Sequence, residues 1–294
     1  MRPSIRQLVR AQSIPTSVSA SNPFDKYKRE KKQDVRAPDV KKDKKLTQLI
    51  AAWKKFRLEE DGKIWYPTTF NKIRELLKGI NYSTRDVEKF SVAIAEFQQD
   101  EDLDYDFGIL RGYGHEGLVR YMFATKAGAF LSVLINNCPD SDFVIHTSHL
   151  DPKPDYLCSE NTKNVTIIGD VGNWFADSAK GGLLIIEGNA AGWVGRGIQE
   201  GVTVILKGNA SSGAGTGIWG GKLIVEGNAL GLIGCEMGKG SILIKGNGGN
   251  AVGLHMKGGE VHIEGEYESL GETIYGGKIY HRAKLIYPKV DKQK

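Results

Sequence analysis

The feature that most constrains this chain is a repeat of nineteen or twenty residues in its C-terminal half. One glycine recurs with successive spacings of 19, 20, 19, 19 and 19 residues. A unit this short cannot bury an apolar face alone, whereas stacked units bury a continuous one. The repeat therefore predicts a solenoid. The reference glycines are Gly169, Gly188, Gly208, Gly227, Gly246 and Gly265.

Two aliphatic columns lie four and two residues before each reference glycine. Alternation with a period of two indicates a strand whose aliphatic side faces inward. Because asparagine tolerates left-handed backbone and bonds its own turn, the asparagines that follow the glycine predict the same corner after each strand. The inward columns are Val165, Leu184, Val204, Leu223, Ile242 and Val261, and Ile167, Ile186, Leu206, Val225, Ile244 and Ile263; the corner asparagines are Asn189, Asn209, Asn228 and Asn247.

A second apolar column lies ten residues after the reference glycine, and a glycine turn precedes each new strand. This arrangement predicts a mainly β fold, a right-handed parallel β-helix of about six to seven coils over residues 161–285. Residues 286–294 are then a tail. The second column is Ala179, Ile198, Ile218, Met237, Met256 and Tyr275.

Two further columns face outward from the predicted strands. At the position one residue before the reference glycine, the sign of the charge alternates from coil to coil. We therefore expect ion pairs between adjacent coils, each of which stabilises the fold by about 0–1 kcal/mol. Three residues before the glycine lies a run of aliphatic residues, which we name the docking face. Because soluble proteins normally cover such a patch, we predict that a protein partner docks there. The charged column is Glu187, Lys207, Glu226, Lys245 and Glu264; the docking face is Ile185, Ile205, Ile224 and Leu243.

Two partners fit the docking face. The favoured one is the chain's own region 46–160, and the other is self-association with a second copy. Region 46–160 is predicted to be a cap of helical and mixed α/β structure. Apolar spacing predicts three short helices within 46–99, capped at Thr68 or Thr69 and at Ser83 or Thr84. A buried helix over Ala127–Asn136 and a strand over Asp142–Thr147 follow.

Residues 1–45 carry 13 basic and 5 acidic side chains, a net charge of +8, which leaves −3 for the rest of the chain. Few large apolar residues and four prolines predict a disordered basic arm. Arginine and serine without any acid in residues 1–22 also fit an organelle transit peptide, the alternative to a cytoplasmic location. Clustered cations can bind nucleic acid, but interspersed acids make that partner the weaker interpretation.

The sequence predicts no catalytic, cofactor-binding or metal-binding residue. Three cysteines without a C-x-x-C motif argue against a disulfide framework and a zinc site. Asp177 and Glu236 lie three coils apart, about 14 Å, too far for paired acid–base chemistry. Trp174 and Trp193 can stack as a ladder or serve as a sugar platform. No apolar run approaches the roughly 18 residues of a membrane span, so we expect no membrane partner.

Three stretches resemble the GXGXG glycine-repeat domain, which closes the large subunit of glutamate synthase and also forms one of the subunits of formylmethanofuran dehydrogenase. They are GNAAGWVGRG (188–197), GNASSGAGTG (208–217) and GNALGLIG (227–234). The resemblance covers about residues 160–280. It implies a right-handed β-helix that orients catalytic domains or subunits and holds no cofactor itself.

The sequence departs from the amidotransferase members of that family, because Arg2 follows Met1 where they need a cysteine nucleophile. We therefore expect a non-catalytic structural or assembly module, a scaffold subunit of an oxidoreductase complex. Two alternatives stay open: a catalytic or glycan-binding β-solenoid, and a nucleic-acid-associated protein that uses the basic arm.

Overall fold

The computed structural model describes residues 40–58, 67–98 and 114–288, all within one compact unit of the chain. Residues 1–39 of the predicted arm lie outside the described residues, as do the acidic stretch 100–106 and the last six residues of the tail.

The described end of the predicted arm is helical. After the 3-10 helix η1 (Val40–Lys42), helix α2 (Lys44–Lys55) begins because the Asp43 carboxylate accepts hydrogen bonds from the Lys45 and Leu46 amides, both at 3.1 Å.

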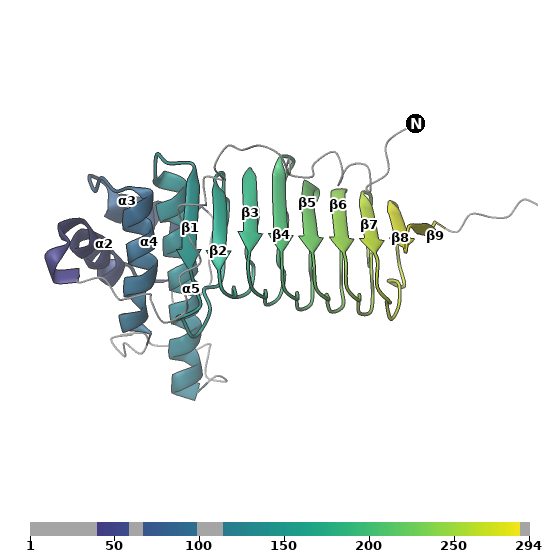
Figure 1. The fold of residues 1–294 in the computed structure, drawn as a ribbon, viewed down its shortest axis with the longest axis horizontal. Helices are drawn as coiled ribbons and strands as arrows, with labels where there is room; N and C mark the ends of the chain where they lie inside the picture. Colours follow the sequence, from purple (N-terminus) through teal and green to yellow (C-terminus); the bar gives the residue numbers. More distant parts are fainter. Residues whose placement is uncertain (1–39, 59–66, 99–113, 289–294) are drawn as a thin grey trace, which may run out of the picture. The chain divides into compact units, whose positions relative to one another are not determined.

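The chain forms a single nine-stranded sheet whose strands follow one another in sequence order. Strands β1 to β8 pair in parallel, and β9 returns antiparallel to β8 (Figure 1). The predicted parallel β-solenoid is confirmed. The strands are β1 (Asp142–His146), β2 (Asn164–Ile168), β3 (Gly182–Ile186), β4 (Val202–Leu206), β5 (Trp219–Val225), β6 (Lys239–Ile244), β7 (Glu260–Ile263), β8 (Lys278–His281) and β9 (Lys284–Tyr287).

The register of the sheet follows the sequence repeat. Val204 pairs with Leu223, and Leu206 pairs with Val225, so each inward column continues from coil to coil. Every residue of the two inward columns is at most 1% exposed. The repeat is therefore the height of one coil, and its aliphatic positions form the continuous core that stacked units need.

Both ends of the solenoid differ from the sequence prediction. Parallel pairing already begins between β1 and β2, so the solenoid starts near residue 142 rather than at 161. Ile263 pairs with His281, which makes the last coil 18 residues long. This shortening moves Tyr275 out of the second apolar column: it is 67% exposed, and Ile274 packs against the core instead.

The predicted helices precede the sheet. Helix α2 is followed by α3 (Thr68–Leu77), α4 (Thr84–Ala93), the short 3-10 helix η2 (Ile94–Phe97) and α5 (Gly114–Asn137). Ser83 caps α4, with a reciprocal hydrogen bond from the Ser83 amide to Asp86 at 2.9 Å. The predicted threonine cap of α3 is wrong, because Pro67 holds the cap position and Thr69 is buried.

The helices pack against the first coil, at the β1 end of the stack (Figure 1). Helix α4 contacts β1, and α5 contacts the chain after β1, where the Asp155 amide donates to the Ala124 carbonyl at 3.0 Å. Gly128 allows this approach, since a Cβ there would lie 1.6 Å from the Asp155 oxygen. Helix and solenoid residues form one hydrophobic cluster.

Helix α5 corrects the expectation that nothing in the chain reaches the length of a membrane span. Among the described residues, Glu116–Asn137 is long and apolar enough, with a mean hydropathy of 1.4. However, 78% of its apolar window is buried inside the structure. The helix behaves as the central helix of the cap, and its apolar character serves packing against α3, α4 and the first coil.

Candidate functional site

The six corner glycines are needed for close contact between coils. Gly169 alone among the six has a positive φ, at +123°. At Gly208, a Cβ would lie 2.4 Å from the Gly188 carbonyl oxygen. At Gly188, Gly227, Gly246 and Gly265, a Cβ would likewise lie 2.5–2.6 Å from the carbonyl oxygen of the preceding corner glycine. A neighbouring coil already occupies the space that these glycines leave open. The corners are thus structural and offer no room for a partner's backbone.

The corner asparagines also serve the stack, and the prediction that each bonds its own turn is wrong. Each side-chain oxygen accepts a hydrogen bond from the amide at the same position of the next coil. The series begins at Asp170, which accepts from the Asn189 amide at 2.7 Å. It continues through the acceptors Asn189, Asn209, Asn228 and Asn247, with distances of 2.9, 2.8, 2.8 and 2.9 Å.

A different property, the backbone conformation, explains the glycines of the GXGXG pattern. Gly213, Gly215 and Gly217 have φ values of +83°, +69° and +64°. The equivalent positions of other coils keep the left-handed conformation with other residues, including Glu236 at 57° and His255 at 56°. A left-handed L-residue costs about 1–2 kcal/mol. Because strained backbone is often found at functional sites, the side chains at these left-handed positions are candidates for a binding or catalytic role.

Three aromatic residues at these left-handed positions form a ladder. Tyr156 and Trp174 stack with ring centroids 4.7 Å apart, and Trp174 and Trp193 at 5.4 Å. The predicted stacking is confirmed. The outer side of Trp193 faces Gly213, whose Cβ would lie 2.6 Å from the Trp193 ring. Because the ring faces cover one another, the ladder is a poor sugar platform; burial also raises the pKa of the Tyr156 hydroxyl above its usual range.

The acidic residues that could have served catalysis lie apart. Asp177 is 1% exposed and accepts two hydrogen bonds from Arg196, at 2.7 and 3.0 Å. A buried carboxylate held in this way stabilises the corner, since an unpaired one would be costly. Glu236 is exposed three coils away. Burial raises the pKa of the neighbouring Cys235 thiol, which disfavours the thiolate that a nucleophile needs.

Glu236 lines a shallow depression that sequence reasoning missed. The depression measures about 660 Å³, and His255, Lys257 and Tyr275 complete it. The His255 and Tyr275 rings stack at 5.9 Å. These groups can hydrogen-bond a polar ligand. The available signal was the replacement of glycine by Glu236 and His255 in the GXGXG pattern.

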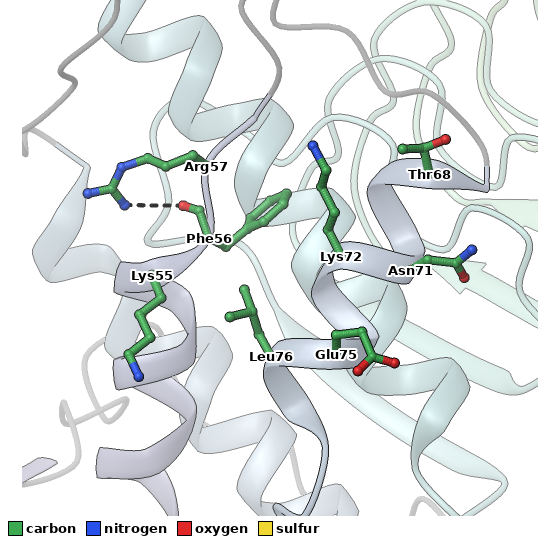
Figure 2. Close-up of a pocket in the computed structure, with 8 residues that line it drawn as sticks. All are labelled: Lys55, Phe56, Arg57, Thr68, Asn71, Lys72, Glu75 and Leu76. Atoms are coloured by element: carbon green, nitrogen blue, oxygen red, sulfur yellow. Dashed lines mark hydrogen bonds between the residues drawn. The ribbon is translucent and has the colours of Figure 1, made fainter.

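A second depression lies between α2 and α3 and measures about 730 Å³ (Figure 2). Two of the three cations that line it have partners already. Arg57 donates to the carbonyls of Lys54 and Phe56, and Lys72 is engaged in an interaction as well. Residues 59–66, which join the two helices, lie outside the described part. This depression carries no functional assignment.

The docking face lies along the middle of the sheet, on β3 to β6. Ile185, Ile205 and Ile224 are partly exposed, and Leu243 is 8% exposed. Adjacent members pair in register, as Ile205 does with Ile224. In the described part of region 46–160, the helices pack extensively against β1, and β1 pairs with β2. None of its described elements packs extensively against β3 to β6, so this part does not cover the column, contrary to the favoured prediction.

The charged column beside the docking face closes one of its expected ion pairs. Lys245 Nζ lies 2.9 Å from a Glu226 carboxylate oxygen. Glu187 and Lys207 are exposed, and neither has an ion-pair partner among the residues that the structure describes. The expectation of ion pairs throughout the column is thus only partly met, and two opposite charges remain for interaction outside the coil stack.

Comparisons with family models, with curated proteins and with solved structures find no match to this chain. Within the described ranges, no group of three or more histidine, cysteine or acidic side chains is arranged to hold a metal ion.

Proposed function

We propose that this chain is a non-catalytic assembly module that binds protein through the outer face of its solenoid. The docking face carries the proposal. Four consecutive coils place one large aliphatic side chain at the same outward position, and register keeps these side chains in a straight column. Burying apolar area contributes about 25 cal/mol per Å², so a continuous column gives more binding energy than scattered residues.

Membership of the GXGXG β-helix family is part of this proposal. Support comes from the left-handed backbone at alternate positions, exemplified by Gly213, Gly215 and Gly217, and from its recurrence in the other coils. A rigid stack with repeated corners suits a scaffold that orients other subunits. By the family resemblance, the assembly is an oxidoreductase complex similar to glutamate synthase or formylmethanofuran dehydrogenase.

Replacing the centre of the docking face tests the assembly function. The double variant Ile205→Asp/Ile224→Asp should keep its circular dichroism spectrum, because both side chains point outward from β4 and β5. Its assemblies should dissociate, because two charges would be buried in the interface. Sedimentation velocity of the full chain measures this. The control Gln199→Asp/Lys239→Asp places new acids at exposed positions outside the column.

The oxidoreductase part needs a separate experiment. The tagged full chain is captured from its native cells, and each candidate flavin or iron–sulfur partner is then purified and recombined with it. A stoichiometric complex that forms with the control but not with Ile205→Asp/Ile224→Asp supports the scaffold function. Assemblies that are identical in both variants would show that the docking face holds nothing.

A further inference from the structure

We propose that the partner of the docking face is a second copy of this chain, in a two-fold dimer that pairs β4 with the partner's β5. The inference rests on the proposed function, because it names the occupant of the same surface. It follows from the order of charges along the sheet and from the part of the sheet that the helices leave open.

The docking face lies within the part of the outer face that the helices leave open. On β1, the outward side chain Val144 is 3% exposed, and α4 packs against that strand. Among the described elements, β2 to β8 have no extensive helix contact, and the docking face occupies four of these strands, β3 to β6. The midpoint of the docking face lies between β4 and β5.

A two-fold axis parallel to the strands and between two such faces reverses the order of the coils. It leaves every column opposite its own copy, as an isologous interface requires. About the midpoint of β4 and β5, Ile205 then lies opposite the partner subunit's Ile224. Ile185 lies opposite the partner subunit's Leu243. The aliphatic columns thus meet along their full length.

The same register matches the four central charges of the column one residue before the reference glycine. Lys207 lies opposite the partner subunit's Glu226, and Glu187 lies opposite the partner subunit's Lys245. Moving the axis onto the centre of any one coil places like charges opposite each other, because the sign alternates from coil to coil. Like charges in contact would be destabilising. Glu187 and Lys207, which have no ion-pair partner among the described residues of one chain, would therefore gain partners in the dimer, beside the existing Glu226–Lys245 pair.

The expected dimer is weak and sensitive to salt. Six strands at about 4.8 Å and five residues at about 3.3 Å give a footprint of roughly 29 Å by 16 Å. This is smaller than the roughly 800 Å² per partner of a standard interface. Exposed charge pairs add specificity more than affinity and are screened by salt. We expect dissociation constants between about 1 μM and 1 mM.

Charge reversal tests the register. In a dimer of Lys207→Glu, both central pairs become Glu–Glu, and in Glu226→Lys both become Lys–Lys. Each single variant should therefore dimerise at least about tenfold more weakly than the wild type, a loss of about 1.4 kcal/mol. Sedimentation equilibrium of the full chain at low salt measures the constants. Glu272→Lys, an exposed reversal in the last coil, is the matched control.

Mixing the two variants gives the decisive result. In a heterodimer of Lys207→Glu with Glu226→Lys, every central pair again joins opposite charges. The mixture should recover an association constant within about threefold of the wild type, since threefold is only about 0.7 kcal/mol. The double variant in one chain should recover it too. Failure of both to recover would overturn this register, whatever the single variants do.

Other outcomes separate this inference from the proposed function. A wild-type chain that stays monomeric up to about 1 mM overturns the dimer, since that is the weak end of specific association. If such a monomer still binds another protein in a manner lost in Ile205→Asp/Ile224→Asp, the proposed function stands. A dimer that both the charge reversals and the aspartates leave unaffected uses another surface and overturns this inference. The proposed function fails as well only if no other protein binds in a manner that is lost in Ile205→Asp/Ile224→Asp.

Discussion

At the scale of single residues, glycine has two separate functions in this fold. The corner glycines are required by the closeness of the neighbouring coil, with Cβ clashes against backbone atoms that cannot move aside. The glycines of the GXGXG pattern are favoured by a left-handed backbone, and Gly217 has nothing within 4 Å of an added Cβ, whereas a Cβ at Gly215 would lie 2.4 Å from the Ile242 side chain. Substitutions at the two kinds of position therefore have different physical costs.

We expect Gly208→Ala to lower the free energy of unfolding by about 1–3 kcal/mol, the usual effect of overpacking. The added Cβ would lie 2.4 Å from the Gly188 carbonyl oxygen, and the two coils would have to separate. Urea denaturation followed by circular dichroism measures the change.

Gly181→Ala is the control for this substitution. An added Cβ at Gly181 meets its nearest atom at an ordinary 3.8 Å, and the residue has no positive φ. It should change stability by less than about 1 kcal/mol, since the main effect there is on the unfolded chain. Equal losses in the two variants would contradict the close-contact explanation.

At the scale of elements, the contact between α5 and the first coil contains an unusual carboxyl group. Asp155 is 5% exposed, and burial raises its pKa to about 6, opposed by hydrogen bonds from Asn173. Its amide donates to the Ala124 carbonyl of α5. Above about pH 6 the Asp155 carboxyl therefore becomes negatively charged at the contact between α5 and the first coil.

This raised pKa makes stability depend on pH. The folded state binds the Asp155 proton more tightly than the unfolded state, whose pKa is near 3.8. The stabilisation is therefore full below about pH 4 and is lost as the pH rises through about 6, by up to about 3 kcal/mol. Asp155→Asn stays neutral and should become more stable than the wild type as the pH rises through this window.

Urea denaturation of both proteins between about pH 4 and pH 7 measures this difference. Asp151→Asn is the matched control, because Asp151 is mostly exposed and forms an ion pair with the exposed Arg120. Its effect should remain below about 1 kcal/mol at every pH. A difference between Asp155→Asn and wild type that does not change with pH would contradict the assignment.

At the scale of the whole described unit, the helical cap and the solenoid share one hydrophobic cluster. Its members extend from Leu46 in α2 to Ile279 in β8. Helix α5 seals the end of the solenoid at β1, where Gly128 lies directly against the first coil. The cap therefore protects an end of the sheet that would otherwise present unpaired strands and an open core.

We expect the cap and the solenoid to unfold in one cooperative transition. Fluorotryptophan NMR can follow Trp53, buried in the cap, and Trp174, in the ladder of the solenoid, during urea denaturation. Coincident midpoints are the expected result for a single cooperative unit. A cap that unfolds at clearly lower urea would show that the shared cluster does not couple the two parts.

Helices α2, α3 and α4 were largely predictable, because each carries its own apolar face. Helix α5 is apolar on all sides and begins at Gly114, whereas the sequence predicted a helix only over Ala127–Asn136. Ser83 with Asp86 forms the expected cap of α4. The depression around Glu236 and His255 was not predictable in the same way. Its side chains come from three coils, and a side chain's neighbours across coils are about nineteen residues away in sequence.

The sequence by itself determined the coil period, the inward columns and the identity of the outward columns. A repeat imposes the same geometry on every coil, so one alignment places all of them. Only the tertiary structure decided where the solenoid begins, why Tyr275 is exposed, and what the corner asparagines bond. These depend on the irregular end coils and on contacts between coils, which a periodic pattern within one unit does not encode.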